Sequence, residues 1–247
     1  MNHYREVEGL PVSLISERVK FNVPNGPVNN NISFEDKKTG TTTVGIIGTD
    51  FVLLAADQQA TMGYMAADDD AVKIYKITNN VALTISGAVG DSLAIIRFLK
   101  AQANLYEIER ETKITPKALT SLMSNVLNGN RYYPFIFMPI VGGINAKPEL
   151  YEVTPFGCIS EKKKYAVTGS GTEYAIATLD VDYREAMTED EAMGLAVKAI
   201  SVSRNRDINT GGKGITVAII DKDGYRLVDE KEVDKVMSKI KLNFTKK

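Results

Sequence analysis

Gly40-Thr41-Thr42-Thr43-Val44-Gly45-Ile46-Ile47 is the stretch of this 247-residue chain that says most about its fold. A glycine is followed directly by a run of threonines and then by apolar, β-branched residues, which are typical of a buried strand. Taken alone, such a run is most often an ordinary strand start. Its further meaning depends on what the rest of the chain contains and lacks.

The rest of the chain lacks the usual catalytic base. The only histidine is His3, so a Ser-His or Cys-His hydrolase is excluded for residues 41–247. A hydroxyl nucleophile still needs a nearby base. The α-amino group of a chain has a reference pKa of about 7.7–8.0 and can serve as that base. If the Gly40–Thr41 bond is cut, Thr41 carries both the hydroxyl and the amine.

Composition and charge narrow the class of protein. Lys+Arg number 30 and Asp+Glu 31, which leaves a net charge of −1 and indicates no nucleic-acid partner. The single cysteine, Cys158, cannot form an internal disulfide, which fits a reducing compartment, and no Cys/His cluster suggests a metal. No apolar run reaches the roughly 18 residues that a membrane span needs, and the N-terminal residues do not resemble a signal peptide. We therefore expect a cytoplasmic α/β protein with no cofactor, no metal and no membrane partner.

The first 40 residues differ in composition from the rest. Residues 22–31 are rich in turn-forming residues and can bury little, and residues 35–38 are charged. A disordered tail without consequence is one interpretation. Because the segment ends at the candidate nucleophile, we favour the other, in which residues 1–40 are a prosegment removed on maturation and residues 41–247 form the functional domain.

Hydrophobic periodicity predicts strands that are grouped apart from helix pairs. Strands are expected at 43–48, 51–57, 72–77, 81–86, 134–144, 149–153, 164–168 and on both sides of the turn at 221–224. Helices are expected at 91–111, from Thr115-Pro116 onward, at 172–183, at 188–205 and in a short final segment. Direct connections between consecutive strands imply antiparallel sheets rather than βαβ units. This order fits two stacked antiparallel sheets with helix pairs outside them.

Two charged residues lie in strands that should be apolar. Asp57 ends the expected strand 51–57, and Lys73 lies within the expected strand 72–77. Singly, such an aspartate usually begins a turn, and such a lysine usually faces solvent. Together they supply what an amine base lacks, because a lysine beside Thr41 would lower the pKa of the α-amine and stabilise a developing alkoxide. The aspartate would hold that lysine charged and oriented.

Three short segments between elements carry further candidates. Ser170 lies in Thr168-Gly169-Ser170-Gly171, and Asp207 and Thr210 lie in the loop 206–212. Singly, each of these segments is most often a helix cap or a loop. The glycine-rich segment around Gly87 lacks the ending of a phosphate-binding loop, and we expect its N–H to face a developing oxyanion instead.

With these motifs in this order, the chain resembles a β subunit of the proteasome core particle of the archaeal type, a threonine peptidase of the N-terminal nucleophile hydrolase superfamily. The resemblance runs from Gly40 to about Leu242. It implies an α+β fold, a four-layer αββα sandwich of two antiparallel sheets between helix pairs. It also implies autocatalytic cleavage before Thr41, which would then be nucleophile and, through its amine, base. It further implies that Asp57 and Lys73 tune the reactivity of Thr41. Ser170 and Asp207 would support the Thr41 amine, and the N–H of Gly87 would form the oxyanion hole.

The resemblance implies an assembly as well. The family places seven β subunits in a ring and two stacked β rings between two rings of α subunits, with the sites facing a closed chamber. A regulatory ATPase would act through the α rings and deliver unfolded polypeptide substrates. The sequence leaves open whether the β ring is homo- or hetero-heptameric.

By the same resemblance, the side chain before the scissile bond would meet Ala60, Ala71, Ile85 and Val89. These residues are small or apolar, which favours cleavage after large apolar residues. The chain departs from the family at Gln58-Gln59, at Asp68-Asp69-Asp70 and at Thr210, which stands in place of serine but keeps a hydroxyl among the catalytic residues. The acidic run is either a solvated turn or an acidic rim on this pocket.

Two alternatives remain open. The bacterial two-component relative of the proteasome also begins Thr-Thr and has Gln-Ala-Thr after its aspartate, as in Gln59-Ala60-Thr61 here, but it is markedly shorter and has a very short prosegment. The other alternative is a structural, non-cleaving β subunit of a mixed ring. Such subunits generally lose the nucleophile, its glycine or the lysine, whereas this chain has Thr41, Gly40 and Lys73.

Overall fold

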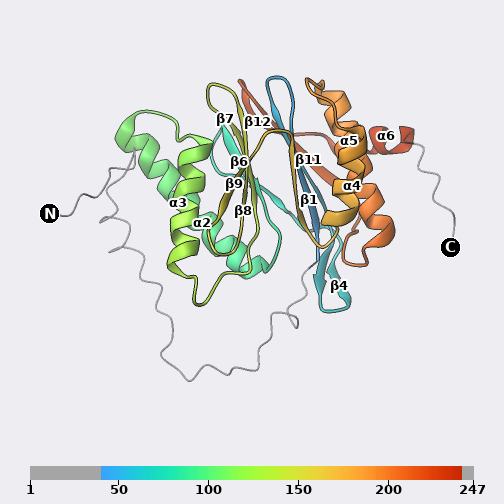
Figure 1. Cartoon of the computed structure of the whole chain (residues 1–247), viewed down its shortest axis with the longest axis horizontal. Coiled ribbons are helices and arrows are strands. Elements are labelled where there is room, and N and C mark those ends of the chain that lie inside the picture. Colours follow the sequence, from blue (N-terminus) through green and yellow to red (C-terminus); the bar gives the residue numbers. More distant parts are fainter. Residues whose placement is uncertain (1–39, 241–247) are drawn as a thin grey trace. The chain divides into compact units, whose positions relative to one another are not determined.

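A computed structural model describes residues 40–240 (Figure 1), so the predicted prosegment, apart from Gly40, lies outside the described residues. The strands are β1 (Thr42–Ile47), β2 (Val52–Asp57), β3 (Ala60–Met62), β4 (Met65–Asp68), β5 (Ile74–Lys76), β6 (Val81–Thr84), β7 (Ile140–Ile144), β8 (Pro148–Val153), β9 (Ile159–Lys162), β10 (Tyr165–Gly169), β11 (Ile215–Asp221) and β12 (Gly224–Leu227). The helices are α2 (Val89–Arg110), α3 (Pro116–Gly129), α4 (Thr172–Asp182), α5 (Glu189–Arg206) and α6 (Glu230–Lys239).

Most of the strands form two five-stranded sheets. The first sheet has the order β10-β1-β2-β11-β12, and the second has the order β5-β6-β7-β8-β9. The pairings in both sheets are antiparallel, which confirms the prediction from the short connections. The hairpin β3–β4 stands apart as a two-stranded sheet between β2 and β5 in the chain.

The two sheets pack against each other, and helices cover their other faces. α4 and α5 pack on the first sheet, whereas α3, with α2 beside it, packs on the second (Figure 1). Side chains of β2 alternate accordingly, because Val52 and Leu54 belong to the core between the sheets and Leu53 and Ala55 to the core under α5. Full burial of one such leucine contributes roughly 1.5–3 kcal/mol. Burial of both faces explains the continuous apolar sequence of β2, which ends on the buried carboxylate of Asp57.

The structure corrects the sequence-based elements in three places. β7 begins at Ile140 and not at residue 134, because Pro134 and Pro139 have no N–H for a ladder, and Phe137 makes only an isolated bridge. Lys73 immediately precedes β5 and does not lie within it. The strand β9 and the hairpin β3–β4 were not predicted, since both are largely exposed and lack a repeated buried face.

Two predicted helix starts are confirmed by their side-chain caps. The Thr115 hydroxyl accepts a hydrogen bond from the N–H of Ala118 at 3.1 Å, with Pro116 in the first turn of α3. Thr188 and Glu191 form the reciprocal capping box at the start of α5.

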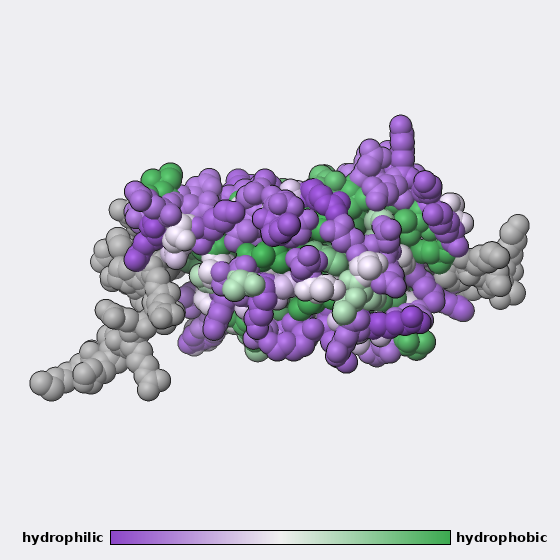
Figure 2. Space-filling model, turned by 90° about the horizontal axis from the view of Figure 1, so that it is seen from above, coloured by the Kyte–Doolittle hydropathy of each residue, from purple (hydrophilic) through white to green (hydrophobic). Residues whose placement is uncertain are grey.

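The surface combines polar residues with isolated apolar ones. Figure 2 shows one face that is mainly hydrophilic, with hydrophobic residues in small groups. Single exposed apolar side chains are normal on a protein surface. Met62, Tyr64 and Met65 of the β3–β4 hairpin are exposed, so this hairpin keeps its apolar side chains outside both cores. None of the helices within residues 40–240 is long and apolar enough to cross a membrane.

Candidate active site

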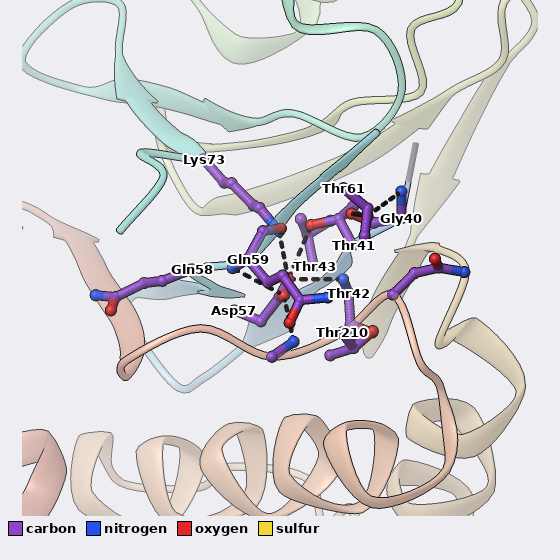
Figure 3. A network of polar contacts seen from close by, with 12 residues as sticks. Gly40, Thr41, Thr42, Thr43, Asp57, Gln58, Gln59, Thr61, Lys73 and Thr210 are labelled. Atoms are coloured by element: carbon purple, nitrogen blue, oxygen red, sulfur yellow. Dashed lines mark hydrogen bonds and ion pairs between the residues drawn. The ribbon is translucent and has the colours of Figure 1, made fainter. Parts of the chain in front are cut away.

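Thr41 immediately precedes β1, and its side chain is turned toward the end of β2 (Figure 3). The residue is buried, and its hydroxyl donates a hydrogen bond to Oδ1 of Asp57 at 2.8 Å. Its backbone N–H donates to the hydroxyl of Ser170 at 3.1 Å. Because Gly40 is still attached, this nitrogen is an amide here and cannot act as a base.

Asp57 is the centre of the polar network in Figure 3. The carboxylate is fully buried, so its charge requires hydrogen-bond partners. Oδ1 accepts from Thr41 Oγ1 at 2.8 Å, from the N–H of Thr42 at 2.9 Å and from Lys73 Nζ at 2.7 Å. Oδ2 accepts from the N–H of Gln59 at 3.2 Å and from the N–H of Gly211 at 2.9 Å. The aspartate is therefore held in place and does not merely begin a turn.

Lys73 is buried beside this carboxylate and does not face solvent. Its ammonium group donates to Asp57 Oδ1 at 2.7 Å and to the carbonyl oxygen of Gln59 at 2.5 Å. Burial lowers the pKa of Lys73 below its ordinary value, and the nearby Asp57 carboxylate opposes that shift. The prediction that Asp57 would pair with Lys73 is thus met by the geometry.

The second group of polar residues joins the β10–α4 turn to the C-terminal end of α5. The hydroxyls of Ser170 and Thr210 each donate to Oδ2 of Asp207 at 2.5 Å. The Thr210 hydroxyl also lies 2.7 Å from that of Thr42, so the extra methyl group of threonine is accommodated and the hydroxyl stays in the network. Since Ser170 also accepts from the Thr41 N–H, the predicted residues form one connected chain of hydrogen bonds.

Glycine is required in the β10–α4 turn and in the loop before α2. Gly169 has φ +105°, and a Cβ there would lie 2.1 Å from the carbonyl oxygen of Thr41. Gly87 has φ +115°, and a Cβ there would lie 2.2 Å from the carbonyl oxygen of Ile136. Only glycine adopts these backbone angles without strain. Gly87 lines the same pocket as Thr41, which fits the expected position of an oxyanion donor.

A pocket of about 200 Å³ opens beside Thr41. The structure brings together in its lining the four residues predicted for the substrate side chain, Ala60, Ala71, Ile85 and Val89. Thr61, Asp68 and Tyr75 also line the pocket. Of these, Tyr75 could have been found from the sequence, because it follows Lys73 by two residues and neighbouring odd positions of an extended segment share a face. Thr61 carried no such signal.

The acidic run Asp68-Asp69-Asp70 was interpreted either as a solvated turn or as an acidic rim on the pocket, and its three residues differ in this respect. Asp69 and Asp70 are exposed and lie 3.3 and 3.8 Å from the ammonium group of Lys213. They therefore belong to a solvated surface pair. Asp68 lines the pocket, and its Oδ1 accepts from the N–H of Asp70 at 3.0 Å. One carboxylate of the three thus lies at the rim.

Comparison with known proteins shows the family to which this chain belongs. The family described as "Proteasome subunit" matches residues 37–220, and this chain belongs to that family. Its relatives place it among the β subunits of the proteasome core. "Proteasome subunit beta" of Methanocaldococcus fervens is 40% identical over 214 residues, which cover 86% of this chain and 95% of the relative. "Proteasome subunit beta" of Methanococcus maripaludis is 40% identical over 86% of this chain and 98% of the relative. "Proteasome subunit beta 1" of Thermococcus sibiricus is 41% identical over 83% of this chain and 98% of the relative.

Proposed function

We propose that this chain is a threonine endopeptidase subunit of the proteasome core particle, activated when cleavage after Gly40 exposes the amine of Thr41. The observation that carries the proposal is the hydrogen bond from Thr41 Oγ1 to Asp57 Oδ1 at 2.8 Å, on the same oxygen that holds Lys73 Nζ at 2.7 Å. A hydroxyl, a buried carboxylate and a buried cation meet at one point. This combination is expected where a weak nucleophile must be activated without histidine.

In the cleaved chain, the Thr41 amine would take the hydroxyl proton while Oγ1 attacks the carbonyl carbon of a bound peptide. The charge of Lys73 would lower the pKa of that amine and stabilise the developing alkoxide. Ser170, which already contacts the Thr41 nitrogen and is tied to Asp207, would hold the amine in place. The Gly87 N–H would donate to the oxyanion.

Removal of residues 1–40 would use the same hydroxyl. Thr41 Oγ1 would attack the carbonyl carbon of Gly40 and shift the acyl group from nitrogen to oxygen, and water would then open the ester. Glycine at position 40 suits this step, because a Cβ there would lie 1.7 Å from the Cβ of Asn209. In this proposal, residues 1–40 are a prosegment and residues 41–247 the peptidase domain.

The packing order of helices and sheets supports a four-layer αββα sandwich as the full architecture.

We propose that the subunit occupies a seven-membered β ring, homo- or hetero-heptameric, stacked on a second β ring between two α rings. The particle would act in the cytoplasm on unfolded polypeptides that a regulatory ATPase supplies through the α rings. The alternative is a structural, non-cleaving β subunit. Mass spectrometry of the chain from the assembled particle separates the two, since an uncut chain starting before Thr41 supports the structural role.

The pocket predicts a preference for cleavage after large apolar residues. Burial of a leucyl or aromatic side chain against Ala60, Ala71 and Ile85 would contribute roughly 1.5–3 kcal/mol. An ion pair of substrate arginine with the exposed Asp68 would contribute only about 0–1 kcal/mol. We therefore expect the assembled particle to cleave fluorogenic peptides ending in Leu or Tyr faster than those ending in Arg or Glu. A preference for Arg that disappears in Asp68→Asn would show that the rim carboxylate dominates.

The rate of peptide cleavage should fall as the pH rises, and the fall should begin below pH 10.5, the ordinary pKa of lysine. Burial lowers the pKa of Lys73, so the ammonium group loses its proton at a lower pH than an exposed lysine does. Once it is neutral, it no longer lowers the pKa of the Thr41 amine or stabilises negative charge on Oγ1. The measurement is a pH–rate profile of the mature particle, with circular dichroism to show that the fold is intact. An unchanged rate up to pH 10.5 would contradict this role of Lys73.

A further inference from the structure

Thr61 contacts both polar backbone groups of the residue that is cut (Figure 3). Its hydroxyl accepts a hydrogen bond from the N–H of Gly40 at 2.9 Å and donates one to the carbonyl oxygen of Gly40 at 3.3 Å. A threonine hydroxyl has one proton to donate and lone pairs to accept with, so it can make both bonds at once. Within residues 40–240, the Gly40 oxygen receives its hydrogen bond from Thr61.

The local backbone explains why this side chain reaches Gly40. Thr61 follows Ala60 in β3, and the register of the β3–β4 hairpin shifts between these two residues. A shift of this kind bends a strand and changes the direction of its side chains. Thr61 is half-buried and lines the pocket together with Gly40 and Thr41. Its hydroxyl is therefore partly shielded from water, which strengthens its hydrogen bonds.

We infer that Thr61 is a catalytic residue for the cleavage between Gly40 and Thr41, in which its hydroxyl stabilises the oxyanion formed on the Gly40 oxygen. The inference rests on the proposed function, because it concerns the self-cleavage step. It assigns to Thr61 a role that differs from that of Gly87, the expected donor for bound peptides.

The chemistry of the step places charge where Thr61 donates. As Thr41 Oγ1 bonds to the Gly40 carbonyl carbon, its proton passes to Asp57 Oδ1 and the carbonyl electron pair moves onto the Gly40 oxygen. The carbon–nitrogen bond then breaks, the nitrogen takes the proton from Asp57, and an ester to Thr41 remains. Water adds to the ester carbon and the bond from that carbon to Thr41 Oγ1 breaks. One water proton returns to Oγ1 and the other passes to the freed Thr41 amine, so Gly40 leaves as a carboxylate. A hydrogen bond to an oxyanion is shorter and stronger than one to a neutral carbonyl, so the Thr61 bond favours the transition state over the ground state.

The test follows self-cleavage of the full-length chain by mass spectrometry during assembly of the particle. Thr61→Val keeps the shape of the side chain and removes the hydroxyl, and we expect it to slow self-cleavage at least about tenfold, in line with loss of an oxyanion donor. Thr61→Ser keeps the hydroxyl and should remain within a few-fold of the wild-type rate. The matched control is Thr112→Val, at an exposed position between α2 and α3, which should have no effect.

A second measurement separates catalysis from structural support. When residues 1–40 are replaced by a removable fusion that leaves Thr41 first, Gly40 is absent, and Thr61→Val should cost less in peptide cleavage than in self-cleavage. Equal losses in both reactions, or self-cleavage of Thr61→Val at the wild-type rate, would overturn the inference. If Thr61→Val fails to assemble, the rates of self-cleavage and of peptide cleavage are compared between Thr61→Ala and Thr61→Ser, and the same outcomes support or overturn the inference. Failure of the wild-type chain to cut itself in the assembled particle would instead refute the proposed function.

Discussion

Thr41→Ala is expected to leave residues 1–40 attached and to abolish peptide cleavage. The substitution removes the hydroxyl that attacks the Gly40 carbonyl in the proposed step, and residues 41–247 contain no histidine that could activate another nucleophile. The loss should be complete within detection, because the same hydroxyl serves both self-cleavage and peptide hydrolysis. Mass spectrometry of the purified particle reports the first effect, and a fluorogenic peptide assay reports the second.

Two variants make this result interpretable. Thr41→Ser keeps a hydroxyl and an amine on adjacent carbons, so it should still be cut after Gly40 and retain measurable peptide cleavage. Thr112→Ala changes an exposed threonine far along the chain and should behave as wild type. Trimming of Thr41→Ala at Gly40 in a protease-free particle would mean that another agent makes the cut, and self-cleavage would be wrong.

The strands that pack on both faces were predicted well, and the exposed ones were missed. β1 carries no polar side chain after its two threonines, and β2 is apolar up to Asp57, because one face of each strand meets the second sheet and the other face meets helices. β9 is mostly exposed and has little apolar character, so a pattern based on burial does not detect it. The error over residues 134–139 has a different origin, because this segment is apolar but Pro134 and Pro139 have no N–H to donate to a ladder.

The site residues that could be predicted from the sequence are those whose charge lies within an apolar stretch. Asp57 and Lys73 are conspicuous because buried charges are costly unless they are paired. The hydroxyls that complete the network are not conspicuous, since threonine is common in strands and turns. Thr61 shows the limit, because its contact with Gly40 depends on a register shift that leaves no mark in the sequence. The partners of Lys213 in the acidic run likewise depend on the fold.

Lys73→Ala should lower peptide cleavage by about 10²-fold or more, the usual size of an activating electrostatic or proton-transfer contribution. The ammonium group lies 2.7 Å from Asp57 Oδ1, the oxygen to which Thr41 donates, so its removal takes the positive charge away from the nucleophile. Self-cleavage should slow as well, because it uses the same hydroxyl. Lys76→Ala is the matched control, since Lys76 belongs to the adjoining strand and its ammonium group contacts the exposed side chain of Asn79.

The fold should survive the loss of Lys73, and this makes the kinetic result decisive. Removing one partner of a buried ion pair commonly costs about 3–5 kcal/mol, because a buried charge is left without compensation. Here Asp57 keeps hydrogen bonds from the Thr41 hydroxyl and from the backbone N–H groups of Thr42, Gln59 and Gly211, so the cost should be lower. We expect Lys73→Ala to assemble with the wild-type particle size by gel filtration while its turnover collapses. Near-normal turnover in an assembled Lys73→Ala particle would show that Lys73 only packs beside the site, and that the activation of Thr41 must come from Asp57 and the amine alone.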